Sequence, residues 1–181
     1  MNRNLRTFSR GTGFTTLGKI RVVSWFLVEH LVFTLPITPS RLRRWILRVF
    51  GAQIGARLFI RRDVQVHYPW NLEIGDDCWI GEGAWFINHE KVVIGNNVCI
   101  SQRAIICSGG HDYRSVSLTY KHAPITIDDG AWVCLDAKIL PGTSIGKGSV
   151  IAAGEVARGD IPDFHKLIGG KLKSIEPPTR P

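Results

Sequence analysis

The chain has 181 residues, of which 44% are apolar and 21% are charged, and this globular composition excludes a disordered or collagen-like chain. Its length suits one domain with an appendage. The net charge of +8 is unevenly placed, because residues 1–62 carry 12 Lys and Arg against one acid whereas residues 63–181 carry 11 against 14. A domain that binds nucleic acid would be basic through its folded body. We therefore expect no nucleic-acid partner, and the basic amino-terminal part indicates an anionic surface such as a membrane.

Residues 1–50 form a basic and apolar segment that we predict to be helical. Residues 22–35 are an apolar run, broken by Glu29 and His30 and closed by a proline. The run is shorter than the ~20 residues that cross a bilayer, and no small-residue cleavage site follows it, so we predict neither a membrane span nor a signal peptide. Residues 41–50 alternate basic and apolar positions at helical spacing, which suits a membrane interface. Two interpretations stay open: the helices bind the membrane, or they only cover the open end of the folded body.

Aliphatic side chains recur at six-residue spacing through most of the remaining chain. This period fits neither a helix nor a single hairpin, and it predicts short strands joined by turns, three to a triangular coil of about 18 residues. Each aliphatic residue would fill the interior, a small residue four positions later would fit a corner, and the glycine that often follows would allow the turn. The repeat positions are Ile54, Ile60, Val66, Ile74, Ile80, Phe86, Ile94, Ile100, Ile106, Ile127, Val133, Ile139, Ile145 and Ile151.

The repeat predicts an all-β fold, with a parallel β-helix over residues 51–156 and a carboxy-terminal extension at 157–181. Ile94 and Ile127 are 33 residues apart, about 15 more than one coil needs. An excursion loop therefore leaves the coils at about residues 108–124. A loop of that size on a solenoid is typical of a binding site.

The four cysteines are Cys78, Cys99, Cys107 and Cys134. Because no two of them form a C-x-x-C pair, neither a zinc ribbon nor a redox motif is predicted. We expect inert, packed thiols in a reducing compartment.

Three short segments, together with the hexapeptide pattern, resemble a known family. Residues 67–75 read His-Tyr-Pro-Trp-Asn-Leu-Glu-Ile-Gly, residues 100–102 read Ile-Ser-Gln and residues 110–113 read Gly-His-Asp-Tyr. Together they resemble the left-handed β-helix acyltransferases, most closely the colanic-acid-type sugar O-acetyltransferases of exopolysaccharide synthesis. The resemblance covers about residues 45–176, and its most specific part is the His-Asp-Tyr loop with the Pro-Ile-Thr-Ile and Ala-Trp that follow. It implies a left-handed coil, a homotrimer, and acetyl-CoA bound in a cleft between subunits.

Transfer of acetyl from a thioester to a sugar hydroxyl needs a base, because an unassisted hydroxyl is a poor nucleophile at neutral pH. Histidine, with an ordinary pKa of about 6.5, is the natural candidate. Of the six histidines, His111 opens the excursion loop, follows two glycines and precedes Asp112. The resemblance places the catalytic histidine at this same position. We predict His111 as the general base, against a loop histidine that caps a turn, and Asp112 as a group that orients or stabilises its ring.

The bulge between Phe86 and Ile94 holds Asn88 and His89, one coil before His111. In the galactoside and maltose acetyltransferases this position helps to hold the acceptor. The resemblance thus implies acceptor contact at Asn88 and His89, against the alternative of a turn asparagine.

The resemblance also places acetyl-CoA along the last coils. It implies that Trp132 lies beside the reaction site, that the backbone of Ala153 meets the pantetheine arm, and that Lys173 and the neighbouring Arg158 lie near the nucleotide phosphates. Trp132 has a plainer alternative as a surface aromatic in a trimer contact. Gly159 stands where related enzymes often have lysine, and a lysine replaces the usual proline of the terminal stretch, so the nucleotide-end contacts depart from the family pattern.

Two other classes share this fold. His67, His89 and His111 recur every 22 residues. This recurrence makes the γ-type carbonic anhydrases, which bind zinc through histidines, an alternative to consider. Measured from the aliphatic positions, however, these histidines occupy three different places along the coil edge and should not converge on one tetrahedral site. We therefore predict no metal. A noncatalytic scaffold would leave no reason for His111 and its loop.

The sequence thus predicts an acetyl-CoA-dependent O-acetyltransferase that modifies a sugar in exopolysaccharide or lipopolysaccharide synthesis. Both substrates meet in one cleft, so no covalent acyl-enzyme is needed. The acceptor is a nucleotide sugar or a lipid-linked oligosaccharide, and the nearest alternative is an N-acetyltransferase acting on an amino sugar. The expected location is the cytoplasm, at the inner face of the membrane where the helices bind it.

Overall fold

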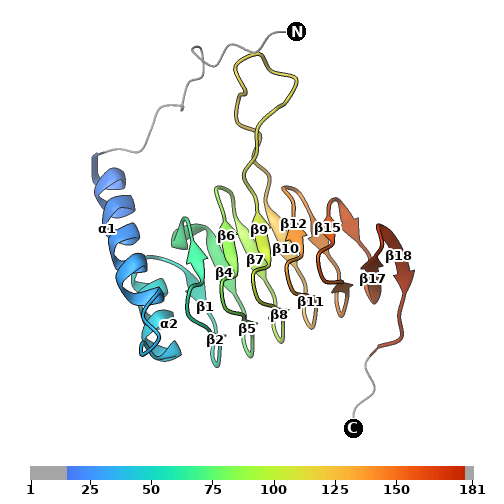
Figure 1. Ribbon diagram of the computed structural model, residues 1–181, viewed down its shortest axis with the longest axis horizontal. Helices are drawn as coiled ribbons and strands as arrows, with labels where there is room; N and C mark the ends of the chain where they lie inside the picture. Colours follow the sequence, from blue (N-terminus) through green and yellow to red (C-terminus); the bar gives the residue numbers. More distant parts are fainter. Residues whose placement is uncertain (1–15, 178–181) are drawn as a thin grey trace.

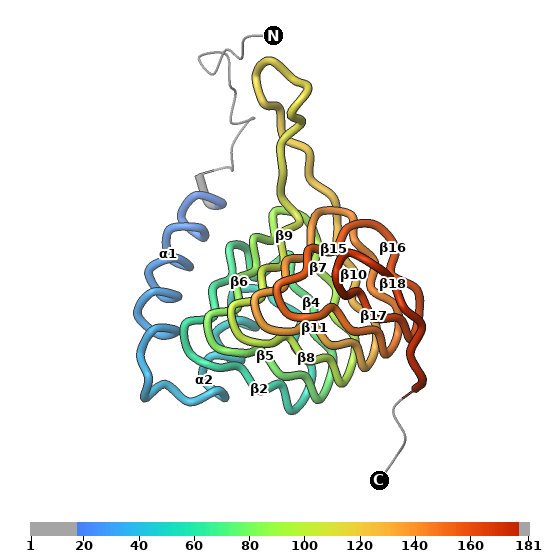
Figure 2. The backbone as a smooth tube through the Cα atoms, turned by 45° about the vertical axis from the view of Figure 1, so that its right-hand side comes forward, coloured from blue at the N-terminus to red at the C-terminus, as the bar shows by residue number. Residues whose placement is uncertain are grey.

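A computed structural model describes residues 16–177 of the chain. Two helices come first, α1 (Thr16–Phe33) and α2 (Ser40–Val49), and both lie at one end of a stack of short strands (Figure 1). The chain then winds through the stack coil by coil to a hairpin of β17 (His165–Ile168) and β18 (Lys171–Ser174) at the other end. The excursion loop stands away from the coils near the middle of the stack (Figure 2).

Three sheets run along the stack, and within residues 16–177 neighbouring strands pair in parallel except for β17 with β18. The first sheet contains β1 (Gln53–Ile54), β4 (Leu72–Ile74), β7 (Val92–Ile94), β10 (Ile125–Ile127), β13 (Ser144–Ile145) and β16 (Asp160–Ile161). The second contains β2 (Phe59–Ile60), β5 (Trp79–Ile80), β8 (Cys99–Ile100), β11 (Trp132–Val133), β14 (Val150–Ile151), β17 and β18. The third contains β3 (Gln65–Val66), β6 (Trp85–Ile87), β9 (Ile105–Cys107), β12 (Lys138–Ile139) and β15 (Val156–Ala157).

The register of these sheets stacks each repeat residue on its counterpart in the next coil. Ile74 pairs with Ile94, and Ile94 pairs with Ile127 across the excursion loop. The repeat residues from Ile60 to Ile151 are buried and form one continuous core. Each such side chain contributes roughly 1.5–3 kcal/mol of hydrophobic stabilisation. The parallel coil predicted from the six-residue repeat is confirmed.

Glycine after the repeat residue is required where successive coils touch. A Cβ on Gly75 would lie 2.5 Å from Oδ1 of Asn96 and 2.8 Å from the carbonyl carbon of Gly95. The same Asn96 oxygen accepts the N–H of Asp76 at 2.8 Å, and Oδ1 of Asp76 accepts the N–H of Ala56 at 2.6 Å. The glycine therefore admits a ladder of side-chain hydrogen bonds that ties this corner from coil to coil.

The two helices cover the first coil. Trp25 of α1 is fully buried, and its Nε1 donates to the carbonyl oxygen of Val66 at 2.6 Å. On α2, Ile46 and Leu47 are buried, and the buried Arg43 donates to main-chain carbonyl oxygens. One side of each helix therefore closes the open end of the solenoid, as the capping interpretation expects.

Within the described residues, no helix combines the length and the apolar character needed to cross a membrane.

Parallel pairing continues past residue 156, the predicted end of the β-helix. β16 pairs with β13 and β17 pairs with β14, before β18 turns back antiparallel. The predicted extension at 157–181 thus begins within the last coil. Leu167, which pairs with Ile151, is buried and continues the core column.

Extra residues enter the coils at one corner, between the third sheet and the first. This corner holds the 3₁₀ helix η2 (Pro69–Asn71) in the first coil, residues 88–91 in the second and the excursion loop in the third. The fourth coil passes it with residues 140–143 alone. The first two coils thus each carry a short insertion at this corner, and the third carries the long excursion loop.

Candidate active site

The excursion loop is a narrow ribbon that leaves the coils between β9 and β10 (Figures 1 and 2). His111 and Tyr120 pair in an antiparallel bridge, and the N–H of Asp112 donates to the carbonyl oxygen of Thr119 at 2.8 Å. Main-chain pairing holds the two limbs together, so His111 and Tyr120 lie side by side on the loop.

The imidazole ring of His111 is held by the backbone of its own loop. Its Nδ1 lies 2.7 Å from the carbonyl oxygen of Leu118. Since a carbonyl oxygen only accepts, Nδ1 carries the proton, and the neutral ring keeps its basic lone pair on Nε2. Leu118 has a φ of 50°, a left-handed conformation that leucine rarely adopts. A strained turn thus supplies the oxygen that fixes the tautomer of His111.

Aromatic rings form a stack from His111 to the coils. The ring centroid of Tyr120 lies 5.0 Å from that of His111 and 4.9 Å from that of His122. The His122 ring stacks on His89 at 5.0 Å with 15° between the planes, and His89 also contacts Tyr68 at 5.3 Å. Each such pair contributes roughly 0.5–1.5 kcal/mol beyond its buried area, so the stack holds the loop on the coils.

The seam between loop and coils is tight. A Cβ on Gly109 would lie 2.6 Å from Cδ2 of His89, and the N–H of Gly110 donates to Nδ1 of His122 at 3.1 Å. Burial, reinforced by the neighbouring imidazoles, lowers the pKa of His89, and burial lowers the pKa of His67. Both rings are therefore neutral at pH 7.

Asp112, predicted to orient the ring of His111, has Arg114 as a partner. Its Oδ1 accepts the N–H of Arg114 at 3.0 Å and lies 3.6 Å from the Arg114 Nε. The backbone hydrogen bond is the largest cause that lowers the pKa of Asp112. Nδ1 of His111 is held by the Leu118 carbonyl oxygen, whereas the sequence predicts that Asp112 orients this ring.

Asn88, predicted to contact the acceptor, is fully buried. Its Oδ1 accepts the N–H of Tyr68 at 3.0 Å, and its Nδ2 donates to the Tyr68 carbonyl oxygen at 2.6 Å. The amide therefore joins two coils, which favours the turn interpretation. His89 is half-buried beside it, on the seam below the loop.

The four residues predicted to bind acetyl-CoA lie on different sides of one chain. Trp132 is half-exposed on β11 in the second sheet, and its Nε1 donates to a serine hydroxyl of the preceding coil at 2.8 Å. Ala153 is exposed between β14 and β15, and Arg158 is exposed at the corner of the excursion loop, two coils further on. Lys173 is exposed on β18 at the end of the stack. A single chain thus distributes these residues around its prism.

The histidines that recur every 22 residues are brought together more closely than their places along the coil edge predict. The rings of His67 and His89 are 5.6 Å apart, and Tyr120 lies between His122 and His111. In residues 16–177, no group of three His, Cys, Asp or Glu side chains is arranged to hold a metal ion.

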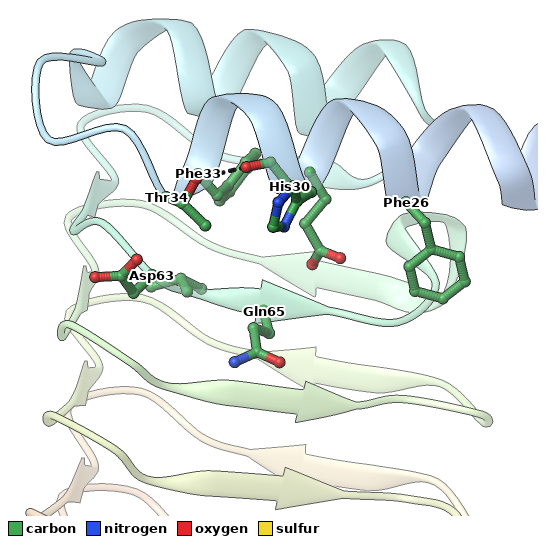
Figure 3. A pocket seen from close by; sticks show the side chains of 8 residues that line it. Phe26, His30, Phe33, Thr34, Asp63 and Gln65 are labelled. Atoms are coloured by element: carbon green, nitrogen blue, oxygen red, sulfur yellow. Dashed lines mark hydrogen bonds between the residues drawn. The ribbon is translucent and has the colours of Figure 1, made fainter.

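A cavity of about 350 Å³ lies between α1 and β3 (Figure 3). Inside it, Glu29 accepts the N–H of Val66 at 2.5 Å, and burial raises the pKa of this carboxyl to about 7. None of the predicted site residues lines the cavity, which belongs to the packing of α1. Its lining residues are Phe26, Glu29, His30, Phe33, Thr34, Asp63, Val64 and Gln65.

Sequence reasoning did not single out Leu118, Tyr120 or His122. A signal existed for two of them, because residues two apart on an extended ribbon project to the same side. Tyr120 and His122 therefore present their rings together. Leu118 acts through its carbonyl oxygen, and its side chain carries no signal of that role.

Comparison with known proteins identifies the family to which the chain belongs. No family model matches the chain. The chain is 36% identical over 154 residues to the colanic acid biosynthesis acetyltransferase WcaF of Escherichia coli (strain K12), an alignment that covers 83% of this chain and 84% of that protein.

Solved structures share the fold. The acetyl-CoA complex of the hexapeptide-repeat acetyltransferase VCA0836 from Vibrio cholerae has a TM-score of 0.80 and 18% identity, with 93% of this chain and 94% of that one covered. A galactoside acetyltransferase in complex with coenzyme A has a TM-score of 0.77 and 21% identity, with 91% and 85% covered. The predicted left-handed parallel β-helix is thereby confirmed. The sequence relationship and the shared fold establish that the chain belongs to the hexapeptide-repeat acetyltransferases and is an acetyltransferase.

Proposed function

We propose that the protein transfers the acetyl group of acetyl-CoA to a hydroxyl group of a sugar, with His111 as the general base. The observation that carries this proposal is the 2.7 Å contact between Nδ1 of His111 and the Leu118 carbonyl oxygen. It keeps the proton on Nδ1 and the basic lone pair on Nε2, as a general base requires.

The reaction needs one proton acceptor and no covalent acyl-enzyme. Nε2 of His111 takes the proton of the sugar hydroxyl while the hydroxyl oxygen attacks the thioester carbonyl carbon. The tetrahedral intermediate then collapses, the carbon–sulfur bond breaks, and the imidazolium returns its proton to the thiolate of coenzyme A. The products are an acetyl ester and free coenzyme A, and His111 regains its starting state.

Acetyl-CoA is the acyl donor, a proposal that the acetyl-CoA and coenzyme A complexes of proteins with this fold support. Arg158 and Lys173 are exposed cations suited to the nucleotide phosphates. Trp132 and the backbone of Ala153 would meet the pantetheine arm. Because Trp132, Ala153 and Lys173 lie on other sides of the prism than the excursion loop, they would act with His111 of a neighbouring copy.

The acceptor is a sugar of exopolysaccharide or lipopolysaccharide synthesis, carried on a nucleotide or a lipid. The name of the colanic acid relative supports this class. His89, half-buried on the seam with a neutral ring, is our candidate for acceptor contact. Such a ring offers both an apolar face and polar nitrogen atoms to a sugar.

The active unit is a homotrimer. Beyond its base, the excursion loop projects away from its own coils (Figure 2), and a neighbouring copy packed against it would supply the second wall of the site. At the tip, the side chains of Tyr113 and Val116 are 74% and 42% exposed, as expected of residues that pack on another chain. Light scattering of the purified protein tests this, and a fully active monomer would contradict it.

The transfer itself is tested with purified protein, acetyl-CoA and candidate sugars, by measuring free thiol and the acetylated product. We compare wild type with His111→Asn, whose amide can still donate to the Leu118 carbonyl oxygen but cannot act as a base. We expect thiol release to fall at least about 10²-fold in the variant, with the product an ester that hydroxylamine cleaves. An amide product that resists hydroxylamine would establish the N-acetyltransferase alternative. Mass spectrometry of surface polysaccharide, with and without the protein, identifies the acceptor in the cell.

A further inference from the structure

Helix α1 is apolar on the side that faces away from the coils. Ile20, Val23, Leu27 and Leu31 are each 59–63% exposed, and they follow one another at helical spacing on one side. The opposite side carries the buried Trp25 and packs on the first coil. A row of exposed apolar side chains on a surface helix normally marks a contact with an apolar partner, and the described coils cover only the opposite side of α1.

Helix α2 and the connection before it repeat this arrangement. Leu42, Trp45 and Val49 are 40%, 59% and 60% exposed at helical spacing, while Ile46 and Leu47 are turned inward. In the connection, Leu35 and Ile37 are 48% and 86% exposed. We call the exposed apolar side chains of residues 20–49 the cap face. Its members are Ile20, Val23, Leu27, Leu31, Leu35, Ile37, Leu42, Trp45 and Val49, whereas the part-exposed Phe26 lines the cavity against β3 and is not counted.

The charge around the cap face is of one sign. Lys19 and Arg41 are exposed and Arg44 is half-exposed, whereas Glu29, the one acid among residues 16–62, is bonded inward to the N–H of Val66. The ion pairs of the described residues all lie at or beyond residue 57. Among the described residues, no carboxylate forms an ion pair with Lys19, Arg41 or Arg44.

We propose that the cap face is a docking surface for an anionic lipid bilayer. Exposed aliphatic side chains on surface helices enter the boundary between headgroups and acyl chains, flanking Lys and Arg attract anionic headgroups, and tryptophan favours the interface. The cap face combines all three, with Trp45 on α2. A contact between two copies would bring these cations against each other, which costs free energy. The bilayer is thus the occupant that the charge favours.

The position of the cap face suits this contact. It lies at one end of the long axis, whereas the excursion loop rises from the middle of the stack (Figures 1 and 2). A protein docked through this end keeps the loop clear of the lipid surface. The site is then held close to the membrane without being covered by it.

The test is sedimentation of full-length protein with vesicles of phosphatidylcholine alone or mixed with phosphatidylglycerol. We expect binding to the anionic vesicles at low salt, and weaker binding as salt screens the cations over about 10 Å at 0.1 M. Val23→Ser with Leu27→Ser should lower the vesicle partition coefficient by roughly tenfold for each side chain. Arg41→Gln with Arg44→Gln should lower it by about 30-fold on anionic vesicles alone, since each cation contributes roughly fivefold.

The matched control is Ile168→Ser with Leu172→Ser, a pair of exposed aliphatic side chains at the opposite end of the stack. This variant should bind vesicles as wild type does. Circular dichroism checks folding, and Trp45→Ser gives a second test on α2 if the α1 variant fails to fold. Wild type that ignores anionic vesicles at low salt would overturn the proposal, as would unchanged binding of the α1 and α2 variants. A cap-face variant that lowers the oligomeric state, with no vesicle binding by wild type, would make this face a protein interface instead.

Discussion

The coils and the excursion loop are held by different means. In the coils, every repeat residue stacks on another in three parallel sheets, and side-chain ladders tie the corners. The loop over residues 108–124 has an antiparallel bridge, a few main-chain hydrogen bonds and a stack of rings. The coils therefore derive stability from many equivalent contacts, whereas the loop depends on a few individual ones.

This difference separates stability from chemistry along one chain. The register of the coils is unchanged across the loop, since Ile94 pairs with Ile127 directly. A long insertion is thus accepted without disturbing the core, as expected when loop closure costs little more for a longer loop. We expect substitutions in the loop to change activity and substitutions in the core column to change folding.

The largest expected effect is that of His111→Ala. Removal of the base should lower kcat by about 10²- to 10⁴-fold. The affinity for acetyl-CoA should stay near wild type, because the proposed donor contacts lie on later coils. Thermal unfolding should also stay near wild type, since the side chain of His111 is exposed on the loop. A fully active, normally folded variant would show that His111 is not the base, and His89 would then be the next candidate.

Ile100→Ala should have the opposite effect to His111→Ala, with a loss of stability and little change in kcat. Ile100 is completely buried between Ile80 and Val133 of the neighbouring coils. Its truncation leaves a cavity and should lower the free energy of unfolding by roughly 2–5 kcal/mol. Urea denaturation measures the loss, and kcat of the protein that remains folded should be nearly unchanged. A loss of kcat without a loss of stability would contradict the separation of the two regions.

Tyr120→Ala should have a smaller effect, confined to activity. Its ring lies between those of His111 and His122, and its loss should loosen the position of the base. Because displacement of a catalytic group by 1 Å can cost about 10²-fold, we expect kcat to fall by roughly tenfold. Tyr120→Phe keeps the ring and should keep most of the rate. Equal activity of the alanine and phenylalanine variants would exclude a positioning role for the ring.

The sequence predicts the coils well because their structure is periodic. The spacing from Ile74 to Ile94 to Ile127 reveals both the register and the length of the insertion, and each later pairing follows from it. The same spacing misses the last coil because the step from Ala157 to Ile161 is four residues instead of six, although Leu167 on β17 resumes the spacing and pairs with Ile151. The sequence therefore predicts the place of a residue in its coil wherever the six-residue spacing continues.

The site is less predictable because its contacts are individual. His111 could be chosen from its place at the loop, but its partner is a main-chain oxygen, which every residue carries. Asn88 has the same residue type whether it binds an acceptor or joins two coils, and only its burial and the two hydrogen bonds to Tyr68 decide between these roles. The amide is turned inward, a fact that the six-residue pattern does not encode.

The smallest expected effect is a pH dependence of stability at the two seams on the coils. At the loop, the pKa of His89 is lowered from its ordinary 6.5. Below that pH the unfolded chain binds more protons than the folded one, so the free energy of unfolding should fall as pH falls. At α1, the pKa of Glu29 is raised from 4.5 to about 7. The folded state then binds more protons between these values, and stability should fall as pH rises.

The two groups therefore act in opposite directions, and one variant of each separates them. Urea denaturation at a series of pH values from 4.5 to 7.5 is the measurement. His89→Phe keeps a ring on the seam and should make the loss of stability toward acid shallower than in wild type. Glu29→Gln keeps an acceptor for the N–H of Val66 and should remove the loss between pH 4.5 and 7. Identical pH profiles for His89→Phe and wild type would mean that the ring of His89 is hydrated, and that the seam beneath the loop is looser than its ring stack indicates.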